Sequence, residues 1–160
     1  MCETDRRQGY ELAMGIPLLR LPHAKGLDLP TYQTEGAAGM DVFAAIEAEW
    51  KIEPGERVLV PTGIAVAVPP GFELQVRPRS GLAIHHGIFL LNSPGTIDSD
   101  YRGVVQVILA NIGREPFVIE RGERIAQMVI APVTQAELRP VPKVDGTERG
   151  EGGFGSSGRS

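Results

Sequence analysis

The chain has 160 residues, which is enough for one hydrophobic core and too few for two independent domains. Hydrophobic residues make up 42% of it and charged residues 22%, as in ordinary globular proteins, and the apolar runs are too short to span a membrane. The formal net charge of −4 opposes general binding to nucleic acids. We therefore expect no nucleic-acid or membrane partner, and an anionic ligand would need a local cluster of positive charge.

Composition also indicates the fold class. Twenty glycines and thirteen prolines predict many turns between short strands, and hence an all-β fold. The single cysteine, Cys2, can form no internal disulfide, which fits a reducing compartment. Residues 1–13 lack the apolar run of a secretory signal, so we expect an N-terminal extension without fixed structure and a cytoplasmic location.

The first predicted strands occupy residues 17–21 and 40–45. Residues 57–68 predict a pair of strands, because Pro61-Thr62-Gly63 between them has the composition of a turn. Apolar and polar residues then alternate over 72–77, which is typical of a strand with one buried face. This strand carries Arg77 on its polar face.

The second half of the chain begins with the only predicted helix, at residues 80–86, which starts at Ser80 and is closed by Gly87. Further strands are predicted at 88–92, 104–110 and 125–132. Residues 104–110 are apolar on both faces except at Gln106, which implies a second layer of structure or a neighbouring subunit.

Two polar patches are candidates for chemistry. At 77–83, Arg77, Arg79 and Ser80 combine guanidinium groups with the free N–H groups of a helix start, which favours an anion site. The alternative is a solvated strand end with Arg79 in a salt bridge. Residues 92–103 predict a hairpin carrying Asp98 and Asp100, whose side chains share one side if the backbone is extended and separate if it bends. One of them then acts as a base while the other holds the turn, or both only form turns.

Two more patches lie toward the C-terminus. Residues 121–128 lead from a charged turn into an apolar strand, where the amide of Gln127 needs a partner, either a ligand or a structural contact at a sheet edge. Residues 143–160 contain six charged residues and six glycines, so composition alone predicts disorder. The order of its residues also fits a segment that closes over a nucleotide, with Arg149 near phosphates and Phe154 stacked on a base.

Taken in series, these patches resemble the five ordered motifs of the trimeric dUTPase family over residues 17–158. Residues 38–41 are similar to the first motif and 77–83 to the second. Residues 95–103, 121–127 and 149–158 are similar to the third, fourth and fifth. The resemblance implies a jelly-roll-like β-barrel with at most one short helix at residues 14–142, assembled as a homotrimer with shared active sites. Residues 143–160 would be a flexible, glycine-rich arm that closes the site.

The resemblance also implies a reaction, the Mg²⁺-assisted hydrolysis of dUTP to dUMP and pyrophosphate. This reaction limits uracil incorporation into DNA and supplies dUMP for dTMP synthesis. By similarity, Asp98 activates the attacking water and Tyr101 packs against the deoxyribose. Asp41 lies near metal-bound waters, and no side chain binds the metal directly. The other substrate contacts that the resemblance implies are Arg79, Ser80, Gly81, Asn92, Gly95, Thr96, Ile97, Gln127, Arg149, Phe154, Gly155 and Ser156.

Two other functions compete with this one. A dCTP deaminase has a related fold and a different reaction, and the Asp98–Tyr101 hairpin with the glycine-rich arm favours a dUTPase over it. A binding or regulatory module on the same scaffold is the non-enzymatic alternative, and it is weakened because the expected catalytic positions are all filled.

Overall fold

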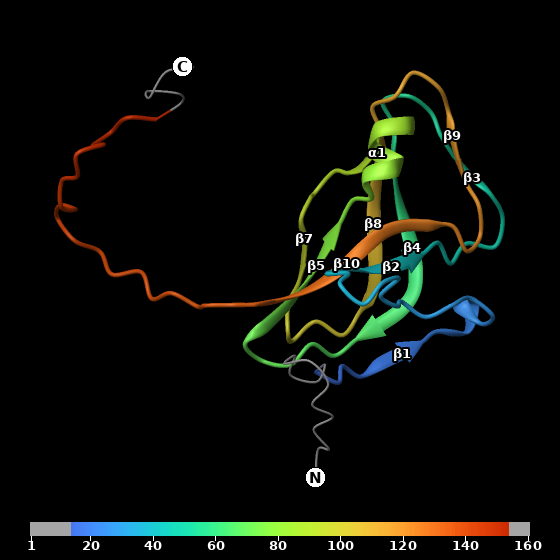
Figure 1. The fold of residues 1–160 in the computed structure, drawn as a ribbon, viewed down its shortest axis with the longest axis horizontal. Helices are drawn as coiled ribbons and strands as arrows, with labels where there is room; N and C mark the ends of the chain where they lie inside the picture. The colour runs from blue at the N-terminus through green and yellow to red at the C-terminus, as the bar shows by residue number, and fades with distance from the viewer. Residues whose placement is uncertain (1–13, 154–160) are drawn as a thin grey trace, which may run out of the picture.

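The computed structural model describes residues 14–153, which form a body of β-sheets and a C-terminal segment that runs away from it (Figure 1). One four-stranded sheet has the order β1 (Leu18–Arg20), β4 (Arg57–Val66), β8 (Val104–Asn111), β6 (Ile88–Leu90). The second has the order β2 (Met40–Phe43), β10 (Arg124–Pro132), β5 (Phe72–Arg77), β7 (Gly95–Ile97). A two-stranded sheet pairs β3 (Trp50–Ile52) with β9 (Phe117–Ile119).

The described residues contain one α-helix, α1 (Ser80–His86), and one 3-10 helix, η1 (Pro22–Ala24). The expected all-β class with a single short helix is therefore confirmed. Gly87 ends α1 as predicted, with a positive φ of 69° and its N–H donating to the carbonyls of Leu82 and Ala83. Neither helix is long and apolar enough to cross a membrane.

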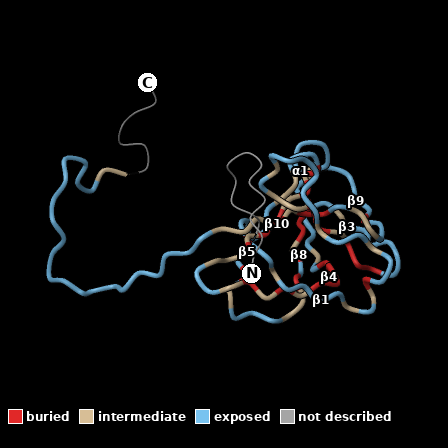
Figure 2. The backbone as a smooth tube through the Cα atoms, turned by 60° about the horizontal axis from the view of Figure 1, so that its bottom comes forward, coloured by how far each residue is buried: buried red, intermediate tan, exposed pale blue. Residues whose placement is uncertain are grey.

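A single hydrophobic core joins the two larger sheets. Val60 and Leu109 enter it from the first sheet, and Leu74 and Met128 from the second, all at most 2% exposed. Burial of each such side chain stabilises the fold by about 1.5–3 kcal/mol. Figure 2 shows this buried interior inside the body, while residues 132–151 of the C-terminal segment are exposed.

The predicted strand pair at 57–68 is wrong, because β4 runs through the expected turn as one strand. It pairs with β8 on both sides of a register shift between Pro61 and Ala65. Within the shift, the buried Thr62 hydroxyl donates to the carbonyl of Val105 at 2.6 Å, and Gly63 adopts a positive φ of 67°. The turn-forming residues therefore make a β-bulge that bends the strand without reversing it.

The predicted hairpin at 92–103 is also more complex than expected. β6 and β8 are antiparallel neighbours, but the segment between them contains β7, which crosses to the second sheet and pairs with β5. In this pairing Leu74 lies opposite Ile97, and Val76 lies opposite Gly95. The crossing places the residues after Ile97 beside the beginning of β5.

The bulge in β4 generates a test of stability. Thr62→Val removes the hydroxyl but keeps the shape, so the carbonyl of Val105 loses a buried partner. We expect a loss of about 1–3 kcal/mol in the free energy of unfolding, measured by urea denaturation. Thr34→Val, at an exposed position, is the control and should change stability by less than about 0.5 kcal/mol. Equal stability of the two variants would show that the bulge does not depend on this hydrogen bond.

Candidate functional site

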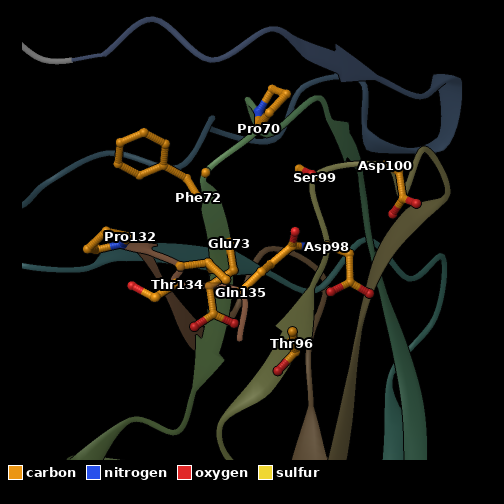
Figure 3. Close-up of a pocket in the computed structure, with 12 residues that line it drawn as sticks. Pro70, Phe72, Glu73, Thr96, Asp98, Ser99, Asp100, Pro132, Thr134 and Gln135 are labelled. Carbon is orange, nitrogen blue, oxygen red and sulfur yellow. The ribbon is translucent and has the colours of Figure 1, made fainter. Parts of the chain in front are cut away.

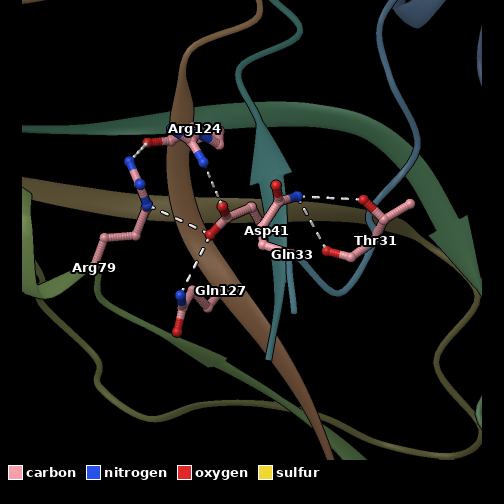
Figure 4. Close-up of polar contacts among 6 residues, drawn as sticks. All are labelled: Thr31, Gln33, Asp41, Arg79, Arg124 and Gln127. Atoms are coloured by element: carbon pink, nitrogen blue, oxygen red, sulfur yellow. Dashed lines mark hydrogen bonds and ion pairs between the residues drawn. The ribbon is translucent and has the colours of Figure 1, made fainter. Parts of the chain in front are cut away.

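A buried carboxylate organises the first polar cluster, which we call the Asp41 cluster and which consists of Asp41, Arg79, Arg124 and Gln127 (Figure 4). Asp41 lies on β2 and is only 3% exposed. One carboxylate oxygen accepts a hydrogen bond from Arg124 Nη1 at 3.1 Å. The other accepts one from Gln127 Nε2 at 3.3 Å and lies 3.4 Å from Arg79 Nε. A buried carboxylate needs such partners, because an unpaired one would be costly to remove from water.

The charge of the Asp41 cluster suits an anionic ligand. Two guanidinium groups surround one carboxylate, which leaves one positive charge in excess. Arg79 Nη1 also donates to the carbonyl of Arg124 at 2.9 Å, which fixes the plane of its guanidinium. Because an arginine has five N–H donors and these contacts use few of them, both arginines keep donors for phosphate oxygens. The sequence left open whether Arg79 forms a salt bridge or belongs to an anion site. The structure shows the salt bridge, in an arrangement that also favours binding of an anion.

The structure decides how Gln127 is satisfied. β10 lies between β2 and β5, so Gln127 is not on a sheet edge, and it stands opposite Asp41 on one side and Arg77 on the other. Its amide donates to Asp41, and a Cβ on Gly39 would lie 3.3 Å from its Oε1. A glycine at position 39 therefore leaves room for this amide, whereas contact between Gln127 and substrate stays a prediction.

A second cluster, which we call the Asp98 pocket, opens beside the beginning of β5 (Figure 3). Its cavity has a volume of about 780 Å³. The residues that line it are Pro70, Gly71, Phe72, Glu73, Thr96, Asp98, Ser99, Asp100, Pro132, Val133, Thr134 and Gln135. Asp98 and Thr96 are both exposed, and Figure 3 shows Asp98 close to Thr96 with Asp100 farther along the turn. An exposed carboxylate in such a pocket can accept a proton from water.

The backbone bends immediately after Asp98. The N–H of Tyr101 donates to the carbonyl of Asp98 at 3.2 Å, which closes a tight turn. Asp98 and Asp100 are therefore not on one extended stretch of backbone. The sequence allowed an extended backbone or a bend between them, and the structure has the bend. Arg102 Nη1 donates to the carbonyls of Ser99 at 2.7 Å and Tyr101 at 2.8 Å, so the turn is fixed from within.

The two clusters lie far apart on one chain. Asp98 follows Ile97, which is paired with Leu74, so it lies level with Glu73. Asp41 lies level with Arg77, with β10 and β5 between it and β7. Four residues along the strands and three strand spacings across the sheet amount to roughly 20 Å. The described chain therefore does not bring its Asp98 to its own Asp41 cluster.

Other predicted residues fall beside one cluster or the other. Asn92 is exposed, and a Cβ on the buried Gly95 would lie 3.3 Å from its Nδ2. Ile97 is only 9% exposed and belongs to the core, so its side chain faces away from any ligand. Ser80 and Gly81 are exposed at the start of α1, directly after Arg79.

The chain leaves the body next to the Asp98 pocket, ten residues before the predicted arm at 143–160. The N–H of Val133 donates to the carbonyl of Gly71 at 2.9 Å, after which the chain runs away from the body (Figure 1). Arg149 is exposed in this segment, and its Nε donates to the carbonyl of Gly152 at 2.8 Å. Of the other predicted arm contacts, Phe154, Gly155 and Ser156 lie outside the described residues.

Sequence reasoning missed two residues of these clusters. Arg124 contacts Asp41, although the two are 83 positions apart. Glu73 lines the pocket that contains Asp98. Arg124 had a usable signal, since it is the charged residue that begins a mostly apolar strand, whereas Glu73 is one of several polar residues on the outer face of β5.

The mostly-β fold carries a cluster of arginines that suits an anionic ligand and a pocket with an exposed carboxylate, and comparisons with known proteins identify its family. A family model described as dUTPase matches residues 25–158. The deoxyuridine 5′-triphosphate nucleotidohydrolase of Rhizobium meliloti (strain 1021) is 60% identical over 149 residues, covering 92% of this chain and 93% of the relative. That of Rhizobium etli (strain CFN 42) is 62% identical over 145 residues, covering 89% and 93%.

Solved structures give the same result. A variant of the Staphylococcus bacteriophage 80alpha dUTPase with dUpNHpp superimposes with a TM-score of 0.81 at 27% identity, covering 92% of this chain and 100% of that one. A variant dUTPase from phage phi11 of S. aureus, described with a structural Mg(II) ion, shares the fold with a TM-score of 0.72 at 22% identity. The chain belongs to the dUTPase family. It is accordingly an enzyme of nucleotide metabolism, a dUTP diphosphatase, and not the related deaminase.

The Asp41 cluster generates a binding test. In Arg79→Lys, a single ammonium group replaces a planar fork and cannot reach Asp41, the carbonyl of Arg124 and a phosphate together. We expect the dissociation constant for the imido analogue dUpNHpp, measured by calorimetry, to rise roughly 10- to 100-fold, as for loss of one or two charged hydrogen bonds.

Arg114→Lys is the matched control, because Arg114 is exposed between β8 and β9 and belongs to neither cluster. It should bind the analogue within about twofold of the wild type. Equal weakening by both substitutions would mean that the effect comes from general positive charge and not from the Asp41 cluster.

Proposed function

We propose that the chain hydrolyses dUTP to dUMP and pyrophosphate by attack of a water molecule that Asp98 activates. The observation that carries this proposal is the exposed carboxylate of Asp98 in an open pocket, held by a turn whose backbone is fixed from within. A general base must reach the proton that it removes, and an exposed, fixed carboxylate meets this requirement.

The proposed step conserves atoms and charge. The water oxygen forms a bond to the α-phosphorus, and its proton passes to the carboxylate of Asp98. The bond between the α-phosphorus and the bridging oxygen breaks, and pyrophosphate leaves with the electron pair. Arg79 and Gln127 contact the phosphates, as do the exposed Ser80 and the N–H of Gly81, so that the growing charge on the leaving group is stabilised.

The residues present fit a Mg²⁺ ion that is bound through the substrate. Among residues 14–153, no group of three or more His, Cys, Asp or Glu side chains could hold a metal by itself, and the phosphates and water supply the oxygen ligands that this cation prefers. When bound to the triphosphate, the cation would offset its negative charge and polarise the phosphoryl oxygens. We propose that the triphosphate and water hold it. The placement of Asp41 near metal-bound waters stays a prediction, and its contacts support a further role in orienting Arg79 and Arg124.

We further propose a homotrimer in which each site combines residues of different chains. The separation of roughly 20 Å between the Asp98 pocket and the Asp41 cluster supports this, because the base and the phosphate contacts must act on one nucleotide. Exposed apolar side chains also favour subunit contacts, among them Ile84 at 77% and Ile112 at 73% exposure. In this assembly the sheets of each subunit would form the jelly-roll-like barrel.

Selection of the nucleotide is assigned to the segment around β7. Tyr101 packs against the deoxyribose, where a 2′-hydroxyl would clash. Asn92, with the backbone of Gly95, Thr96 and Ile97, satisfies the uracil edge and leaves no space for a thymine methyl group. The exposure of Asn92 and Thr96 supports this assignment. Acting in the cytoplasm, the enzyme would limit uracil incorporation into DNA and supply dUMP for dTMP synthesis.

The arm completes the proposed site. Residues 143–160 close over the nucleotide, with Phe154 stacked on the base, followed by Gly155, and with Arg149 and Ser156 on the phosphates. The path of the described part supports this, because it leaves its own body and is free to reach another subunit (Figure 1). Closure would exclude bulk water from the reacting phosphate.

The role of the base has a direct test. Asp98→Asn should lower kcat for dUTP roughly 10²- to 10⁴-fold while dUpNHpp still binds, because only the proton acceptor is removed. Asp100→Asn is the control, since Asp100 lies farther along the turn, and it should retain most of the activity. Pyrophosphate release measures both. A comparable loss in both variants with intact folds would contradict the assignment of Asp98 as the sole base.

Sharing of the site has a sharper test by complementation. Asp98→Asn and Arg79→Ala chains should each have little activity alone. When they are unfolded together and refolded as mixed trimers, roughly one quarter of the sites should combine an intact Asp98 with an intact Arg79 from different chains. Each variant refolded alone is the control. No recovery of activity in the mixed sample would show that both residues act from the same chain.

The arm is tested by truncation. Deletion of residues 146–160 should leave the trimer and its melting temperature nearly unchanged, since the described part of this segment, residues 146–153, contributes nothing to the core. It should strongly reduce turnover of dUTP, and Phe154→Ala should reproduce part of that loss. A truncated enzyme with the full turnover number would refute closure by the arm.

A further inference from the structure

The ring of Tyr101 occupies the space that a side chain at position 103 would need. A Cβ built on Gly103 would lie 2.5 Å from Tyr101 Cζ and 3.0 Å from its Cε2, and it would also meet the hydroxyl. Carbon atoms in ordinary contact are about 3.5–4.0 Å apart. The ring can therefore lie where it does only because residue 103 is glycine.

Other contacts around the ring fix the backbone and leave the side chain as the part that can move. Arg102 Nη1 holds the carbonyls of Ser99 and Tyr101, and the N–H of Tyr101 bonds to Asp98. The Tyr101 hydroxyl donates to the carbonyl of Val104 at 3.2 Å, which tethers the ring across Gly103. Tyr101 is 44% exposed, so moving its side chain disturbs little packing.

We propose that Gly103 is a specificity-determining residue, which sets the position of the Tyr101 ring against the sugar of the nucleotide. This inference rests on the proposed role of Tyr101 in packing against the deoxyribose. A methyl group at position 103 would displace the ring by roughly 1 Å, the difference between the observed separation and an ordinary contact. A displaced ring no longer blocks a 2′-hydroxyl in the same way, so discrimination between dUTP and UTP falls.

Kinetics of the full-length enzyme test the proposal. In Gly103→Ala, the ratio of kcat/KM for dUTP to kcat/KM for UTP should fall about tenfold or more, within the range of roughly 10- to 200-fold typical of a changed pocket wall. The melting temperature should stay close to that of the wild type. Gly36→Ala is the matched control, because nothing lies within 4 Å of a Cβ at that position, and its ratio should not change.

A second measurement reports the ring directly. The chain contains three tyrosines, so 3-fluorotyrosine labelling gives a simple ¹⁹F NMR spectrum, in which the Tyr101 signal is the one lost in Tyr101→Ala. Gly103→Ala should shift the Tyr101 signal and leave the other signals in place. Gly36→Ala should leave the Tyr101 signal unshifted.

The outcomes separate this inference from the proposed function. If Tyr101→Ala lowers discrimination and Gly103→Ala does not, Tyr101 keeps its role and the inference about Gly103 is overturned. If Tyr101→Ala leaves discrimination unchanged, the proposed role of Tyr101 fails and the inference fails with it, whereas hydrolysis of dUTP by the wild type stands. An unshifted Tyr101 signal, or a Gly103→Ala protein that does not fold, would also overturn it, because the ring is then not the part that yields.

Discussion

The position of β5 between β10 and β7 is the constraint on which both polar clusters depend. Burial of Leu74 and Val76 fixes its inner face, and the alternation of a strand then turns Glu73, Gln75 and Arg77 outward. A slip of one residue would exchange the two faces, so hydrophobic burial indirectly decides which side chains meet a ligand. The same register places Asp98 level with one end of the strand and Asp41 level with the other.

The buried carboxylate of Asp41 gives the phosphate side of the site its rigidity. Its removal from water is offset by Arg79, which precedes α1, and by Arg124 and Gln127, which both lie on β10. Each partner is thereby held in one orientation before any ligand binds. A preorganised guanidinium loses less entropy on binding than a free one, so the structural pairing also favours recognition of a phosphate.

Much of this fold could be predicted from local pattern. The alternating residues of β5 and the terminal Gly87 of α1 are strong local signals, and both were read correctly. The bulge in β4 was not predicted, because Pro61-Thr62-Gly63 has the composition of a turn. Only the long-range pairing with β8 makes the strand continue past these residues. β3, β7 and β9, which have three residues each, were not predicted as strands.

The sequence motifs named some members of the two polar clusters but not the geometry that joins them. The motifs, taken in their order along the chain, predicted Arg79, Asp98 and Gln127 as site residues, because a motif consists of residue types at given positions. The contact between Asp41 and Arg124 spans 83 positions and depends on the pairing of β2 with β10, which no local pattern gives. The bonds of Arg102 to the turn were likewise invisible, because they depend on the path of the backbone after Asp98.

Separation of the two clusters also has an electrostatic consequence. An exposed aspartate next to unoccupied arginines would form ion pairs with them, and the base would then be held away from water. At roughly 20 Å, beyond the Debye length of about 8 Å at physiological ionic strength, such pairing between exposed groups is largely screened. In the proposed trimer, the triphosphate and its cation would lie between the carboxylate of one chain and the arginines of the next. Within each chain, the base therefore forms no ion pair with the arginines of the Asp41 cluster, which pair with Asp41 instead.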